Sequence, residues 1–441
     1  MEVKKDTNNA RMRIIWAESA RQGVVRLYFL LLLVVFSVAA GDEASASSCS
    51  ASQDTTTCDL NKSTALQLDA SGGFLIFALS MGRYGNQMEH LLGALAEAKR
   101  RAPHRIVVLP SFIVWRYGRG RRNAHIPVGL LFDLDNLRRD FHGNIVGYDE
   151  FTEMATATKW DPKEATIYCN SAFVQSSHFK CTPDVSEGTY WHSLGIEFTR
   201  EYLYQGDVFD LCPTDHPVVI VGNALSAPFP MRLQDRYVAK HLKWTERMEE
   251  RRRSFLNMKG ISSDDVIVAA HLRAGSDWVK ACEHAVGRES YMASPQCNEE
   301  MKLHNMTELS LEICLPTISL SSVATDLITA GQKVKKAKSG TESTRVVLFI
   351  ATDVQGLGKK IWAEQNLGDT YDLLIGAPEA TEARESDGID ALLEDSSLLD
   401  LIVMTHADYL LGNCVSSFTS FAARIRKEQQ IGFGTDFFGL M

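Results

Sequence analysis

Short apolar runs alternate with amphipathic segments through the second half of the chain. Two runs are continuous and rich in small and β-branched residues, as in strands buried on both faces: Val266–Ala270 and Val346–Ala351. Tyr371–Ile375 and Tyr409–Leu411 are further candidate strands. Helical spacing separates them, around Ser319–Lys336, Leu357–Gln365, Ser396–Thr405 and Ser416–Arg426. Strands that alternate with helices predict a parallel sheet with right-handed crossovers, and therefore an α/β fold.

The first half shows the same pattern less regularly. Phe74–Leu79 reads as a strand, Met81–Gln87 as a glycine-bearing loop, and the residues from Met88 onward as a helix. Further strands are predicted at Arg105–Leu109, Thr166–Cys169 and Val218–Gly222. A charged stretch, Asp235–Met258, predicts one long helix, and we place a domain boundary near residue 245. Residues 72–245 and 246–441 are thus expected to form two Rossmann-like domains.

The N-terminus carries a targeting signal. Basic residues precede the apolar run Leu27–Ala40, which is shorter than the roughly 20 residues that a membrane span needs. We expect residues 1–40 to be a secretory signal, with an uncleaved anchor as the alternative. Residues 41–71 are rich in Ser, Thr and Ala and read as a flexible stem.

Composition narrows the function classes. A formal net charge of -9 argues against a general nucleic-acid binder, which usually shows a basic excess. Nine cysteines, none in a CxxC pair, predict disulfides rather than a zinc site in a secreted chain. Because nine is odd, at least one thiol is left over or pairs outside the chain. Asn61 and Asn305 lie in glycosylation sequons.

The strand Val266–Ala270 ends in polar residues, where open α/β sheets bind ligands. His271 and Arg273 alternate, so both should project to one face. A buried guanidinium cannot lose its proton and needs an anionic partner. That partner is either Asp277, in a structural salt bridge, or a phosphate held beside Gly275.

The loop Gly82-x-x-Gly85-Asn86-Gln87 lies between a predicted strand and helix. Glycines there permit close approach to a ligand, or simply a turn with positive φ. Asn86 could point its amide into a cleft or cap the helix. Asp353 and Asp400 could accept hydrogen bonds from a base or a ribose, or pair locally.

Asn413–Phe418 offers another ligand site. Serines that open a helix present hydroxyls and backbone N–H groups to a phosphate, and Phe418 could stack on a base or fill the core. Asp133-Leu134-Asp135 is similar to a metal-binding DxD motif, but a charged stretch follows it. A helix start or a solvated loop is favoured there, and we assign no metal.

Five motifs occur in consistent order: MGRYGNQ (81–87), HLRAGSDW (271–278), MASPQC (292–297), ATD (351–353) and GNCVSSF (412–418). With them the chain resembles the GDP-fucose protein O-fucosyltransferases that modify EGF-like repeats, from about Gly73 to Gly439. The resemblance implies two Rossmann-like domains facing across a cleft, the GT-B arrangement. It also implies inverting, metal-independent transfer of fucose from GDP-β-L-fucose to a Ser or Thr hydroxyl in the endoplasmic reticulum lumen.

The same resemblance implies the roles of individual residues. The donor is expected to lie among Arg83, Tyr84, Gly85, Asn86, His271, Leu272, Arg273, Asp353, Asp400, Ser416, Ser417 and Phe418. Arg273 would contact the β-phosphate, and Asn86 would lie near the reacting sugar and the acceptor oxygen. Fucosyltransferases for thrombospondin-type repeats or N-glycans, and a non-catalytic EGF-repeat binder, are the alternatives. We expect a monomer.

The resemblance also implies the cysteine pairs Cys169–Cys181, Cys282–Cys314 and Cys297–Cys414. Cys49 and Cys58 could pair in the stem, which leaves Cys212. Ala78 and Ser80 stand where the family has a cysteine pair beside its first strand. The N-terminal signal predicts entry into the lumen. The chain ends FFGLM, without a KDEL-like tail, so the means of retention there is not identified.

Overall fold

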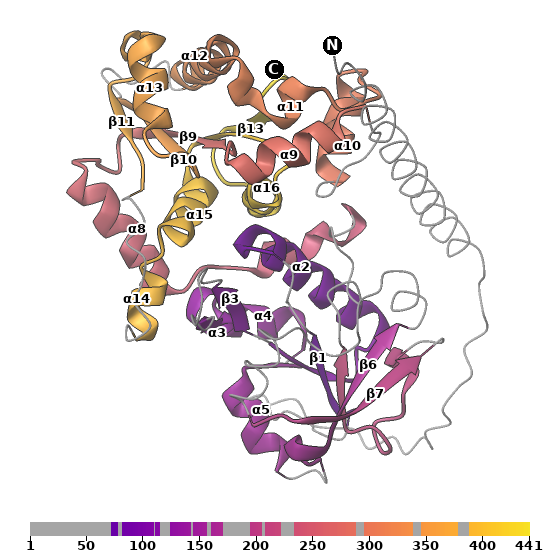
Figure 1. The fold of residues 1–441 in the computed structure, drawn as a ribbon. Coiled ribbons are helices and arrows are strands. Elements are labelled where there is room, and N and C mark those ends of the chain that lie inside the picture. Colours follow the sequence, from indigo (N-terminus) through magenta and orange to yellow (C-terminus); the bar gives the residue numbers. More distant parts are fainter. Residues whose placement is uncertain are drawn as a thin grey trace, which may run out of the picture. The chain divides into compact units, whose positions relative to one another are not determined.

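Two parallel sheets carry the strands that the apolar runs predict, and each sheet comes from a different half of the sequence (Figure 1). This computed structural model describes residues 72–77, 82–109, 111–114, 124–142, 144–156, 160–170, 195–204, 208–221, 233–287, 295–337, 345–377 and 388–441. All of them belong to one compact unit, residues 65–441. The signal, the stem, Asn61, Cys49, Cys58, Ala78, Ser80, Cys181 and Met292–Ser294 lie outside the described residues.

The first sheet has six described strands in the order β5-β2-β1-β8-β6-β7, and their pairings are parallel. The strands are β1 (Phe74–Phe77), β2 (Ile106–Val108), β5 (Ile145–Val146), β6 (Ala165–Asn170), β7 (Phe198–Tyr204) and β8 (Val218–Val221). The helices are α2 (Tyr84–Arg101), α3 (Val128–Leu131), α4 (Leu134–Asp140) and α5 (Tyr148–Ala155). A separate antiparallel hairpin joins β3 (Ser111–Val114) to β4 (Ala124–Pro127). β3, β4, β5 and β7 were not predicted.

The second sheet has the order β11-β10-β9-β12-β13, all parallel. Its strands are β9 (Val266–Leu272), β10 (Val346–Thr352), β11 (Leu373–Ile375), β12 (Tyr409–Gly412) and β13 (Gly434–Phe437). The helices are α8 (Glu246–Met258), α9 (Ser276–Ala285), α10 (Pro295–Leu303), α11 (Leu311–Cys314), α12 (Leu320–Ala337), α13 (Leu357–Glu364), α14 (Ile389–Leu393), α15 (Ser396–His406) and α16 (Ser417–Gln429). Central β9 is buried along its whole length, as its apolar run predicts.

Three local predictions were wrong. Helix α2 begins at Tyr84, so Gly85 to Gln87 form its first turn rather than a loop. The described residues between β9 and α12 include the helices α9, α10 and α11, where only a cysteine-bearing loop had been predicted from the sequence. The long helix Asp235–Met258 is broken into a 3-10 segment, Leu233–His241, and α8.

The break lies at Leu242–Thr245 and has a tertiary cause. The backbone of this segment bonds to the end of α3: Asp133 donates its N–H to the Lys243 carbonyl (2.8 Å), and Thr245 donates to the Leu131 carbonyl (2.9 Å). The Trp244 ring packs on Phe132 with 4.7 Å between centroids. These contacts replace the hydrogen bonds of a continuous helix.

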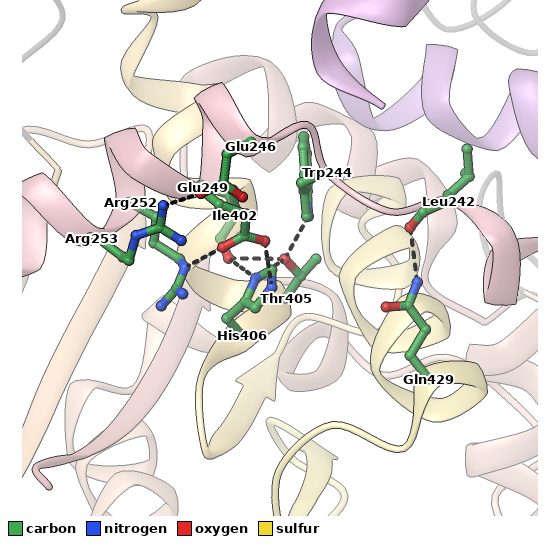
Figure 2. A network of polar contacts seen from close by, with 10 residues as sticks. All are labelled: Leu242, Trp244, Glu246, Glu249, Arg252, Arg253, Ile402, Thr405, His406 and Gln429. Atoms are coloured by element: carbon green, nitrogen blue, oxygen red, sulfur yellow. Dashed lines mark hydrogen bonds and ion pairs between the residues drawn. The ribbon is translucent and has the colours of Figure 1, made fainter. Parts of the chain in front are cut away.

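Figure 2 shows how the segment Leu242–Thr245 and the start of α8 are bonded to helices α15 and α16. Trp244 donates its indole N–H to the Thr405 hydroxyl on α15 (3.0 Å). Glu249 of α8 lies 2.8 Å from His406 Nε2, and Gln429 of α16 donates to the Leu242 carbonyl (2.8 Å). The segment near the predicted boundary at residue 245 is therefore held from both sides; the boundary itself stays a prediction.

Two of the expected disulfides are confirmed. Cys282 bonds to Cys314 and Cys297 to Cys414, with Cα–Cα distances of 5.6 and 4.9 Å. Cys169 is disulfide-bonded as expected. In the described part of the chain, Cys212 alone is free. No helix in that part is long and apolar enough to cross a membrane.

Candidate active site

A cavity of about 1320 Å³ lies where the first turn of α2 meets the carboxyl ends of β9, β10 and β11 and the first turns of α15 and α16. Eleven of the twelve predicted donor-binding residues line it: Arg83, Tyr84, Gly85, Asn86, His271, Arg273, Asp353, Asp400, Ser416, Ser417 and Phe418. Leu272 is the one that does not line it. Alternation along β9 turns its side chain away from His271 and into the core, where it is fully buried.

Arg273 follows β9 directly and is held by two carboxylates. It donates to Asp277 (2.6 Å), the salt bridge that was one of the two alternatives for this residue, and it forms an ion pair with Asp353. Its side chain is 17% exposed and its guanidinium lies 5.7 Å from the centre of the Trp278 ring. Arg273 therefore reaches the cavity with its orientation already set by neighbours.

Asp353 also fixes the backbone beside Arg273. It accepts hydrogen bonds from the N–H groups of Ala274 (2.8 Å) and Gly275 (3.0 Å). A side chain on Gly275 would overlap the Asp353 carboxylate and lie 2.9 Å from that of Asp277, so it would displace the carboxylates that hold Arg273. Local pairing, one of the two roles considered for Asp353, is what the structure shows.

The first turns of α2 and α16 touch at the cavity wall. A Cβ on Gly85 would lie 2.6 Å from the Phe418 backbone nitrogen, so glycine is needed for this close approach. The Ser417 hydroxyl donates to Asn86 Oδ1 (2.5 Å). Asn86 therefore does not cap its own helix, whose start at Arg83 has no side-chain cap. Gly82, by contrast, has a positive φ of 71°, as a tight turn requires.

The start of α16 is suited to an anion. Ser416 is its N-cap residue but makes no side-chain capping hydrogen bond. The N-terminus of a helix of this length presents N–H groups and the positive end of the helix dipole. Phe418 is partly exposed, and its ring centre lies 5.1 Å from that of His271. The Ser416 hydroxyl, the N–H groups at the start of α16 and the Arg273 guanidinium thus line the cavity with hydrogen-bond donors for a phosphate.

Two buried oxygens face the same cavity from α15 and α2. Asp400 Oδ1 and the Tyr84 hydroxyl have no hydrogen-bond partner among the described residues. Burial, and then the nearby Asp395 carboxylate, raise the pKa of Asp400 well above its ordinary value, and the same two causes raise that of Tyr84. A buried polar group without a partner is costly, so a bound ligand that donates hydrogen bonds here would relieve that cost.

Several lining residues were missed. Asp395, Ser396 and Ser397 open α15 and line the cavity, as do Ile113 and Val114 of β3. Helix α15 had been predicted from periodicity, and its serine-rich start resembles that of α16, so this signal could have been used. Strand β3 had no such signal.

Gln87 explains how β3 reaches the cavity wall. Its side chain donates to the Ile113 carbonyl (2.9 Å) and accepts from the Ile113 N–H (2.6 Å). Gln87 is fully buried in the first turn of α2. One residue of the glycine motif thus positions a strand that the sequence did not predict.

The DxD sequence has a structural role. Asp133 caps helix α4 by accepting from the N–H groups of Asp135 (3.0 Å) and Asn136 (3.3 Å), as the helix-start interpretation predicted. Within the described ranges, no group of three His, Cys, Asp or Glu side chains is arranged to hold a metal ion.

Sequence and structure are both similar to those of known fucosyltransferases. Residues 74–429 match the sequence model of GDP-fucose protein O-fucosyltransferase. GDP-fucose protein O-fucosyltransferase 1 of Caenorhabditis elegans is 27% identical over 394 residues, which cover 84% of this chain and 90% of that protein. The crystal structure of POFUT1 in complex with GDP-fucose has a TM-score of 0.64 and 25% identity, covering 86% of this chain and 100% of that one. POFUT1 in complex with GDP gives 0.64 and 26%, with 84% and 99% covered.

Proposed function

Because the chain belongs to the GDP-fucose protein O-fucosyltransferase family, we propose that it transfers fucose from GDP-β-L-fucose to a Ser or Thr hydroxyl of folded EGF-like repeats. One observation carries this proposal. Arg273 lies at the end of the central strand, in the same cavity as the first turn of α16. A guanidinium and a helix N-terminus together suit the diphosphate of a sugar nucleotide.

Arg273 would stabilise the leaving group. As the bond between fucose C1 and the β-phosphate oxygen breaks, negative charge accumulates on GDP. A guanidinium that is already in place stabilises this charge without having to reorganise. Asp277 and Asp353 hold the side chain in place beforehand. Both carboxylates are negatively charged and already bind the guanidinium of Arg273. The incoming diphosphate therefore competes with Asp277 and Asp353 for the N–H donors of Arg273.

Asn86 would lie beside the reacting sugar. Its amide oxygen is engaged by Ser417, which leaves the amide N–H₂ to donate to the sugar or the acceptor oxygen. The new bond joins the acceptor oxygen to C1, with inversion, and the acceptor proton passes to the departing phosphate. Burial, then the charge of Arg273, lower the pKa of His271 to about 3, so this imidazole is neutral and a weak base.

The guanosine would occupy the end of the cavity that Asp400 and Tyr84 face. A guanine offers N–H donors that both buried oxygens can accept. Metal-independent transfer, a monomeric enzyme and residence in the endoplasmic reticulum lumen belong to the same proposal. The first rests on family resemblance and the last on the N-terminal signal.

The test is incubation of the enzyme with GDP-fucose and a folded EGF-like repeat, followed by mass measurement of the repeat. We expect addition of one fucose to the folded repeat and none to the same repeat after reduction. A thrombospondin-type repeat and an N-glycan serve as parallel acceptors. Transfer to either of these instead, or tight binding of EGF repeats without turnover, would contradict the proposal.

A further inference from the structure

A buried chain of hydrogen bonds lies behind the imidazole of His271. The backbone N–H of Asn413 donates to the Thr419 hydroxyl oxygen (3.2 Å), and this oxygen lies 2.6 Å from His271 Nδ1. Asn413 and Thr419 are fully buried, and His271 is 5% exposed. The chain links the end of β12 to α16 and then to the end of β9.

The hydrogen-bonding roles in this chain follow from the number of available protons. A backbone N–H can only donate, so the Thr419 oxygen accepts from Asn413. If His271 Nδ1 carried the imidazole proton and also donated to this oxygen, the buried Thr419 hydroxyl proton would have no acceptor among the residues that the structure describes. Such an unsatisfied donor costs about 1–3 kcal/mol. The Thr419 hydroxyl therefore donates to Nδ1.

This direction determines the tautomer of His271. An imidazole that is neutral and accepts at Nδ1 carries its single proton on Nε2. His271 lines the cavity two residues before Arg273, and its Nδ1 is directed at Thr419 behind it. The Nε2–H group is thus the one left to donate toward a ligand.

Gly412 leaves room for the side chain of Thr419. A side chain on Gly412 would overlap the Thr419 methyl group and lie 3.1 Å from its hydroxyl oxygen. The methyl group occupies the space over this glycine while the hydroxyl faces His271. The absence of a side chain at residue 412 thereby permits the Thr419 rotamer that makes the hydrogen bond.

We propose that Thr419 is a positioning residue that holds His271 as the Nε2–H tautomer, so that a neutral imidazole donates to the diphosphate of the donor. The proposal rests on the transferase function, since that function supplies the diphosphate. A neutral donor beside Arg273 adds a hydrogen bond to the phosphate without adding a second positive charge next to the guanidinium.

The first measurement reads the tautomer directly. Full-length protein labelled with 15N-histidine, without nucleotide, gives two-bond 1H–15N correlations that distinguish the Nε2–H from the Nδ1–H form. The His271 signal is the one that His271→Gln lacks. We expect the Nε2–H pattern in the wild type and in Thr419→Ser, and its loss in Thr419→Val, which has the same shape but no hydroxyl. An Nδ1–H pattern in the wild type would overturn the proposal.

The second measurement is GDP affinity by calorimetry. Thr419→Val should bind GDP about tenfold more weakly, and Thr419→Ser should restore affinity to within about twofold of the wild type. Thr405→Val is the matched control, because it also removes a fully buried hydroxyl, the one bonded to Trp244, but lies away from the cavity. It should change neither the His271 spectrum nor GDP affinity.

The two proposals fail in different ways. A wild-type protein that does not bind GDP would contradict the transferase function, and the nucleotide-free spectrum would still decide the role of Thr419. Thr419→Val with a wild-type spectrum and wild-type GDP affinity would overturn the positioning role alone.

Discussion

The buried ion pair between Glu89 and Arg424 joins helix α2 to helix α16. Arg424 donates to Glu89, and the two side chains are 3% and 0% exposed. The bond is made by Arg424 Nη1, and Nε and Nη2 have no hydrogen-bond partner in the described ranges. Glu89→Gln keeps the shape of the side chain but removes its charge. It leaves a guanidinium that cannot lose its proton, buried without a counter-ion.

Breaking such a pair by changing one partner costs about 3–5 kcal/mol, against a total stability of about 5–15 kcal/mol for ordinary domains. Replacing both partners with apolar groups, as in Glu89→Leu with Arg424→Met, should recover most of the loss because no uncompensated charge remains. Asn86 lies one turn before Glu89, so we also expect slower fucose transfer by the single variant.

Urea unfolding followed by tryptophan fluorescence measures the stability change. Glu246→Gln is the matched control, since it breaks an ion pair with Arg253 in which the side chains are 74% and 47% exposed. It should leave stability unchanged. If Glu89→Gln is as stable as this control, the pair does not stabilise the contact between the helices and the reasoning fails.

Three further predictions concern the cavity and its supports. Gly85→Ala should slow transfer more than about tenfold with little change in melting temperature, because its Cβ would force the Phe418 backbone away; unchanged kinetics would contradict this. Burial raises the pKa of Asp400, so its contribution to stability is present below the ordinary carboxyl pKa and is lost as pH rises. Without nucleotide, Asp400→Asn should therefore melt higher than the wild type at pH 8 but not at pH 4, and equal shifts at both would count against it. Replacing Cys297 and Cys414 with serine opens a loop of 117 residues and should cost about 2–5 kcal/mol in urea unfolding; no loss would show that the bond does not brace the α16 start.

The sequence was sufficient for β9, β10 and β12 because these strands are buried and apolar, whereas β13, GTDF at the sheet edge, has no apolar run and was not predicted. The end of β9 could be identified the same way, and with it His271 and Arg273. Leu272 was included because the family motif was transferred as a block, and strand alternation turns its side chain toward the core, away from the cavity.

Contacts between distant residues account for the rest. Helix α2 starts at Tyr84, and its first turn contacts Ser417, which lies 331 residues from Asn86. The break before α8 depends on hydrogen bonds to Leu131 and Asp133. No local sequence pattern encodes such pairings. The helices themselves could be predicted, but the residues at which they begin and end could not. Family resemblance brought the site residues together because the sequence alone does not say which strand ends are neighbours.

The rate of fucose transfer by Arg273→Ala tests the proposed chemistry most directly. Arg247→Ala is the control, since its side chain is 48% exposed and pairs at the surface with Asp390. With folded EGF repeat and saturating GDP-fucose, loss of leaving-group stabilisation should lower kcat by at least about 100-fold in the Arg273 variant. The control should keep the wild-type rate. An Arg273→Ala enzyme that remains folded and transfers fucose within about tenfold of the wild type would contradict the assigned role.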